Sequence, residues 1–427
     1  MFSIPPEIAD WLQGLSGVFH SASWQTCQYL LVALLYGYGR SSVVRAAQYA
    51  PPDYNWRRLH DFLRIGRWKG YDLVQALIAQ VLGTIYPAAL PARLWWVLDV
   101  TEKEKAFARK IPGIKKHHRG VRGRGQSRTS WSHRFLILGL LVVGRPRWHT
   151  LICSVALLWG RRTFQQQTKA FLRHSLPATP DTIHTLVADR YFGSTRFLTT
   201  VQGTDCEGVV RLKCNFKVCA LPQPRKKNKE GKGPVGRPPE YGAEYRVDEL
   251  PLRQMKRSRH RRRIGNKMYW VTVWRGAFLR KGFGPIEILV IRWGRHGQMW
   301  LAATDPTLTR TEILDGYNGR WSVEPAIHEA KDLGLGQYRG RHMAGVRRHP
   351  LLVAVAHAML SLVGLGYIAV DLPRLDWDWY RCETTVGQIQ RRLLKWFQHD
   401  TEFRSTSQTT KSRENARQPR QSRRKAA

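Results

Sequence analysis

The chain has 427 residues, of which 43% are hydrophobic and 11% aromatic, so it can build a sizeable core and global disorder is excluded. Its 70 Lys and Arg residues outnumber 31 Asp and Glu residues and give a net charge of +39. So large an excess repels itself unless a polyanion neutralises it, which favours a nucleic-acid partner. Six cysteines in so long a chain exclude a disulfide framework and fit a reducing cytoplasm.

Residues 1–90 carry apolar side chains at helical spacing and predict a small helical domain. The spacing recurs around Leu30, from Trp56 to Leu63 and from Tyr71 to Ile85, with a proline break at 51–53. The second of these stretches, around 56–63, is rich in arginine, so we expect the domain to have a basic face. Two interpretations stay open, DNA binding and a packing cap.

From residue 91 the pattern changes to short apolar runs between polar or glycine-rich stretches, which is typical of buried strands. We expect five such strands, at 94–100, 135–143, 150–158, 183–189 and 209–212. The first run ends in Asp99 and the fourth in Asp189, and a helix is expected at 193–201. Acids at the ends of strands place carboxylates at one edge of a sheet, where open α/β folds build their sites.

Residues 214–303 predict a β-rich insertion that divides a core made of 91–213 and 304–370. Its strand-like pieces are Tyr245–Leu250, Met268–Trp274, Ile286–Trp293 and Met299–Ala303. The basic stretches at 222–239 and 257–263 cannot bury a core, and we expect both to be exposed loops.

The last part of the chain predicts three helices and a tail. A long helix is expected from about Thr309 to Leu333, with a capping box at its start. The apolar stretch 351–370 is long enough to cross a membrane. However, it contains His357, Ser361, Gly364 and Gly366, and the chain has no second such stretch. These features favour a buried helix and no membrane partner. A segment at 371–400 contains a last helix, and the basic tail 401–427 is predicted to be disordered.

One face of the helix at 309–333 suits phosphate chemistry. With about 100° per residue, four side chains fall within a stripe of about 60° on the helix surface: Tyr317, Arg320, Glu324 and Lys331. Glu329 lies about 120° around the helix from Tyr317 and is outside this stripe. Glu324 is therefore the best candidate for a third carboxylate beside the two strand acids. Ion pairs on the helix surface are the alternative explanation of this stripe, and spacing alone leaves both open.

Three converging carboxylates suit divalent metal ions, because hard cations prefer oxygen ligands. Asp99, Asp189 and Glu324 are therefore the candidate catalytic and metal-binding residues, for two Mg²⁺ (or Mn²⁺) ions that act on both sides of a phosphodiester bond. Arg320 and Lys331 would hold phosphates close to them.

The same residues resemble a known signature. YNGRWSVEPAIHEAK has the pattern Y-(2)-R-(3)-E-(6)-K of bacterial insertion-sequence DDE transposases of the IS-four type. VLDVT, with Asp99, resembles the first-acid strand of that family, and VADRYFG, with Asp189, its second-acid strand. The resemblance covers about 94–365. It implies an α/β fold with an RNase H-like catalytic core, a mixed sheet flanked by helices, beside the β-rich insertion and the N-terminal helical domain.

The resemblance also implies DNA contacts. Tyr317, Arg320 and Lys331 would bind the transposon end, together with Arg190 beside the second acid. Trp300, in MWLAATD, stands at about the position where relatives stack a tryptophan on a flipped base; a half-buried strand tryptophan is the alternative.

Two further features qualify the resemblance. Gly236-Arg237-Pro238 resembles a hook for an A·T-rich minor groove, with a plain solvated loop as the alternative. Many close relatives carry a second Asp directly after the first acid, where this chain has Val100.

The function that the resemblance implies is cut-and-paste DNA transposition by metal-dependent hydrolysis and strand transfer. Its partners would be the terminal inverted repeats and target DNA, with a homodimer on paired ends. The place of action would be the cytoplasm, at the bacterial nucleoid. Two alternatives stay open: a catalytically silent, domesticated DNA-binding protein, and an RNase H-like nuclease that cuts without joining.

Overall fold

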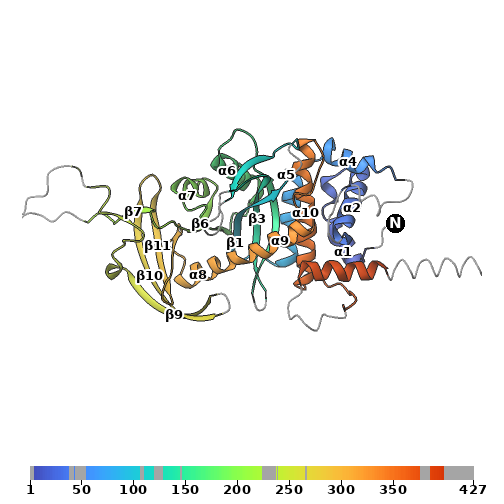
Figure 1. Ribbon diagram of the computed structural model, residues 1–427. Coiled ribbons are helices and arrows are strands. Elements are labelled where there is room, and N and C mark those ends of the chain that lie inside the picture. The colour runs from blue at the N-terminus through green and yellow to red at the C-terminus, as the bar shows by residue number, and fades with distance from the viewer. Residues whose placement is uncertain are drawn as a thin grey trace, which may run out of the picture.

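The computed structural model describes residues 4–37, 43, 54–105, 110–119, 128–144, 147–223, 237, 239–264, 267–375 and 385–398. In these residues a large mixed sheet runs through the molecule, with helices along it and a helical bundle at one end (Figure 1). The α/β class predicted from the sequence is therefore confirmed.

The N-terminal part is a bundle of helices with apolar contacts between them. Its elements are α1 (Pro6–Gln13), η1 (Ser16–Val18), α2 (Ser21–Tyr36), α4 (Arg57–Arg64) and α5 (Gly70–Ile85). Buried indole groups connect them, and the Trp11 Nε1 donates to the Thr84 hydroxyl at 2.9 Å. The helices predicted around Leu30 and at 56–63 and 71–85 are confirmed, while the proline break at 51–53 lies outside the described residues.

The central part contains the five strands expected from the apolar runs. They are β1 (Arg93–Glu104), β3 (Arg128–Val143), β4 (Trp148–Leu157), β5 (Ile183–Ala188) and β6 (Cys206–Arg211). Their order is β4-β3-β1-β5-β6; β3 is antiparallel to β1 and β4, and β5 is parallel to β1 and β6. The short β2 (Lys115–Arg119) pairs with β3.

The two crossovers of this sheet are helical. α6 (Phe164–Ser175) connects β4 to β5, and α7 (Thr195–Gln202) connects β5 to β6. A capping box of Thr163 and Gln166 starts α6, and the Ser194 hydroxyl accepts from the third N–H of α7. The helix predicted at 193–201 is confirmed.

The β-rich part continues the same sheet. Its elements are β7 (Lys217–Cys219), β8 (Glu244–Arg246), η3 (Leu252–Gln254), β9 (Lys256–Ile264), β10 (Lys267–Arg280), β11 (Gly284–Trp293) and β12 (Gly297–Ala303). β12 pairs with β6, so hydrogen bonds run without a break from the central strands into this part.

Two expectations for the β-rich part are wrong. Residues 257–263 are not a loop but most of strand β9, which pairs with β10 alone; arginines suit such an edge because every second side chain points to solvent or to an aromatic ring. The strand expected at 245–250 ends at Arg246, because a turn follows in which the Glu249 N–H donates to the Arg246 carbonyl at 3.0 Å. Most of the basic stretch 222–239 lies outside the described residues.

The long helix expected at 309–333 consists of α8 (Arg310–Gly319), η4 (Arg320–Ser322) and α9 (Val323–Asp332). The predicted capping box of Thr309 and Glu312 is confirmed. The interruption lies just before Pro325, which has no N–H for the carbonyl group four residues earlier.

The apolar helix α10 (Met343–Gly364) packs between β4 and the N-terminal helices α2, α4 and α5. No described helix is long and apolar enough to cross a membrane. The boundaries expected at 351–370 are wrong, because the helix begins at Met343 and ends at Gly364, with Arg347 and Arg348 in its second turn. Arg348 donates there to the carbonyl groups of Leu63 (3.2 Å) and Trp68 (2.8 Å), a long-range contact that an apolar pattern does not reveal.

The last helix, expected at 385–397, spans 386–398 and hydrogen-bonds to α2 through Gln390.

His349 of α10 makes the stability of this packing dependent on pH. It is 3% exposed, and burial, helped by the positive charge of Lys105, lowers its pKa to about 4. The folded pKa lies below the ordinary value of 6.5, so the neutral imidazole stabilises the fold above pH 6.5 and this contribution is lost as the pH falls toward 4. We expect His349→Leu to flatten the fall in unfolding free energy over that window, by up to about 3 kcal/mol. Urea titrations at pH 7 and pH 4.5 test this, and equal pH dependence of both proteins would contradict it.

Candidate active site

Asp99 and Asp189 lie at the same edge of the central sheet. In the parallel pair β1–β5, Leu98 is opposite Ala188, and the next residue on each strand is the acid. β5 ends there, but β1 does not, so the expectation that the first strand ends at Asp99 is wrong. It continues to Glu104 because its antiparallel partner β3 still pairs with it. The register alone therefore places the two carboxylates side by side.

Arg320 connects the third acid to this edge. Its side chain is 6% exposed and lies 3.8 Å from the Asp99 carboxylate and 3.5 Å from that of Glu324. The exposed Trp321 ring lies against the guanidinium, 4.3 Å from ring centroid to Cζ. The helix α8–η4–α9 thus brings Glu324, which is itself half exposed, to the two strand acids.

The pKa of Asp99 shows that the three acids share one electrostatic environment. Burial raises this pKa to about 6, against a hydrogen bond from the Val100 N–H. The negative charges of Asp189 and Glu324 contribute to this increase, and the positive charge of Arg320 opposes it. The carboxylates of Asp189 and Glu324 are therefore both close enough to Asp99 to disfavour its negative charge.

Tyr317 and Arg211 complete the site. Tyr317 is buried, and burial raises its pKa, while the positive charges of Arg320 and Arg211 lower it and Asp189 raises it. The sequence prediction did not include Arg211. It is the last residue of β6, beside the strand that carries Asp189, so its position at the end of a strand was the only available signal.

The other predicted contacts lie at different distances from this centre. Lys331 is half buried on α9, about two helical turns after Glu324. Arg190 is exposed in the turn after β5. Trp300 is half buried in β12, and its carbonyl accepts from the Leu212 N–H, next to Arg211. Arg237 is exposed, but the glycine and proline on either side of it lie outside the described residues.

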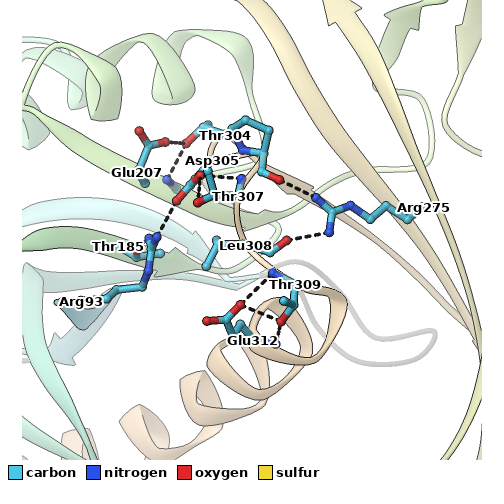
Figure 2. A network of polar contacts seen from close by, with 12 residues as sticks. Arg93, Thr185, Glu207, Arg275, Thr304, Asp305, Thr307, Leu308, Thr309 and Glu312 are labelled. Carbon is cyan, nitrogen blue, oxygen red and sulfur yellow. Dashed lines mark hydrogen bonds and ion pairs between the residues drawn. The ribbon is translucent and has the colours of Figure 1, made fainter. Parts of the chain in front are cut away.

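A polar network fixes where α8 begins, and hence where Glu324 lies (Figure 2). Arg93 of β1 forms a 2.5 Å ion pair with Asp305, which also accepts from the Thr307 N–H and hydroxyl. From the other side Arg275 of β10 donates to the carbonyl groups of Pro306 and Leu308. The segment 304–309 is thereby held between the central strands and the β-rich part.

The donor set of the site suits divalent cations. Asp99, Asp189 and Glu324 offer only carboxylate oxygens, and a cation would relieve the repulsion that Asp189 and Glu324 exert on Asp99. Within the described ranges, His, Cys, Asp and Glu side chains do not form a ready group of three around one metal position. Arg320 takes that central place instead, through its contacts with two of the acids.

Residues 14–275, more than half of the chain, match the family described as DDE superfamily endonuclease. The chain belongs to this family. Membership indicates an enzyme that cleaves nucleic acid, and members of this superfamily typically use divalent metals and act on DNA. The match includes Asp99 and Asp189 and ends before Glu324, so the third acid rests on the geometry above. No curated protein matches the sequence.

Proposed function

We propose that this DDE endonuclease is a DNA transposase of the IS-four type, with Asp99, Asp189 and Glu324 as its catalytic acids. The observation that carries the proposal is that Arg320 contacts both Asp99 and Glu324, while Asp189 follows the neighbouring strand in register with Asp99. The strand order β4-β3-β1-β5-β6, with three antiparallel strands followed by two parallel ones, supports an RNase H-like core.

The three acids are the residues that would hold two Mg²⁺ or Mn²⁺ ions. Such ions activate the attacking oxygen and stabilise the leaving oxygen in phosphodiester hydrolysis and strand transfer. The chain's own cations have a different role. Arg320, and Lys331 further along α9, bind the phosphates on either side of the scissile bond. The buried Tyr317, whose pKa is influenced by the positive charges of Arg320 and Arg211, orients the strand.

The DNA path and the domain roles belong to the same proposal. Arg190 and Arg237 contact phosphates or grooves, and Trp300 stacks on a flipped base. The helical domain 1–90 binds DNA together with the insertion 214–303, whereas 91–213 and 304–370 form the catalytic core. The segments 371–400 and 401–427 add a helix and a basic tail. The enzyme acts in the cytoplasm as a homodimer on paired terminal inverted repeats, and inserts them into target DNA.

The test is a cleavage assay on DNA that carries the sequences flanking the gene in its source genome. Cuts at discrete end positions with Mg²⁺, none with EDTA, and joining of the cut ends to a target plasmid are the expected results. Cutting without joining would identify a nuclease, and tight binding without cutting under any metal a domesticated DNA-binding protein. Either result would overturn the proposal.

A further inference from the structure

The outer strands of the sheet carry arginine and aromatic side chains on one face. Residues opposite each other on paired strands point to the same side. Trp270 is opposite Arg261, Thr272 is opposite Arg259 and Arg292, and Trp274 is opposite Arg257. Two tryptophans and four arginines of β9, β10 and β11 therefore share this face, on neighbouring strands of the β-rich part (Figure 1).

This face is hollowed into a groove, which we call the Trp270 groove. Its lining includes Arg259, Met268, Trp270, Thr272, Trp274 and Arg292. The Trp270 side chain is 57% exposed, an unusual position for the largest apolar residue. The Arg259 guanidinium lies 4.8 Å from the centroid of the Trp270 ring, and that of Arg292 lies 5.4 Å from Trp274. The groove thus has a flat aromatic surface and positive charge along it.

The positive charge of this face is not neutralised. Among the described residues, no carboxylate forms an ion pair with Arg257, Arg259, Arg261 or Arg292. By contrast, Arg262, which points to the opposite face of β9, pairs with Asp315 of α8. Unpaired guanidinium groups beside an exposed ring suit a polyanion that has planar groups, and do not suit an apolar protein surface.

The topology places the Trp270 groove at the same end of the sheet as the catalytic acids. β12 is antiparallel to β6, so its first residues lie beyond the end of β6, where Leu301 is opposite Arg211. The end of β11 and the start of β10 lie at that same end, because Trp293 is opposite both Gly297 and Val271. The register also places the groove on the face of the sheet opposite to that of Asp189 and Arg211, which continues through Leu301 and Trp293 to Val271. A strand leaving the cleavage site therefore reaches the groove by passing over this end of the sheet.

We propose that the Trp270 groove binds an unpaired stretch of a DNA strand, with Trp270 stacked on a base and Arg259 and Arg292 on its phosphates. This inference rests on the proposed function for its choice of DNA. The site is separate from Trp300, which is half buried and does not line the groove. Paired DNA cannot use the ring in this way, because its bases are already stacked on one another.

The experiment measures binding of the full-length protein in EDTA to two labelled probes, a thymidine oligonucleotide and a fully paired duplex, by fluorescence anisotropy. Loss of one base–aromatic stack predicts that Trp270→Ala weakens oligonucleotide binding about tenfold, with duplex binding changed less than about twofold. Trp270→Phe keeps a stacking ring and should retain most of the affinity. Trp159→Ala, at an exposed tryptophan outside the groove, is the matched control and should change neither.

Equal losses on both probes, or no loss on the oligonucleotide, would overturn the inference. Arg259→Gln adds a readout that does not depend on removing a large side chain: the salt dependence of oligonucleotide binding should fall by about one phosphate contact. An unchanged salt slope would also count against the groove. Cleavage with Mg²⁺ is measured separately. Trp270-dependent binding without any cleavage would support this inference and overturn the proposed function. Cleavage and joining without Trp270-dependent binding would overturn this inference and support the proposed function.

Discussion

Glu324→Gln is expected to abolish metal-dependent cleavage, with a loss on the order of a thousandfold or more. The substitution keeps the size of the side chain and its hydrogen bond with Arg320 but removes the negative charge that a divalent ion requires. Binding of DNA should be kept, because most affinity comes from the basic surface. Single-turnover cleavage and a binding titration, measured on the same preparation, test both parts.

The matched control is Glu329→Gln, on the same helix α9. Glu329 points away from the acids, lies 3.5 Å from His357 and accepts from the Val386 N–H at 3.2 Å. Its amide variant should cleave at close to the wild-type rate. If Glu329→Gln were as inactive as Glu324→Gln, the loss would reflect damage to α9, and the assignment of Glu324 as the third acid would fail.

Asp305→Ala is expected to lower the free energy of unfolding by about 3 kcal/mol, because it leaves the Arg93 guanidinium partly buried without its charge partner. The side chains of this pair are 15% and 8% exposed. Burial opposes ionisation of Asp305, but the Thr307 hydrogen bonds and Arg93 outweigh it and lower the pKa of the carboxyl. Urea unfolding followed by circular dichroism measures the change.

Two comparisons separate the buried pair from a general loss of charge. Asp61→Ala removes a carboxylate from an exposed pair with Arg64 and should cost less than about 1 kcal/mol. The double variant Arg93→Met, Asp305→Ala should lose less than the sum of the single variants, since no unpaired charge remains. Strictly additive losses would show that Arg93 and Asp305 do not stabilise the fold as a pair.

The local patterns of the chain determined much of the fold. Short apolar runs predicted the strands that carry Asp99 and Asp189, and a threonine three residues before a glutamate predicted the start of α8. The helical stripe separated Glu324 from Glu329, and the structure pairs these residues with Arg320 and His357 respectively. These predictions succeed because strand and helix periods act over a few neighbouring residues.

The tertiary structure decided what those patterns do not contain. β1 runs past Asp99 because β3 is its partner, and the arginine-rich segment 256–264 is a strand because β10 pairs with it. Arg93 and Asp305, which position the start of α8, are 212 residues apart. The sequence by itself therefore predicted the elements that carry Asp99, Asp189 and Glu324. The cationic side chains, aromatic rings and strands around those acids depend on long-range pairing, and such pairing leaves no repeating pattern in the local sequence.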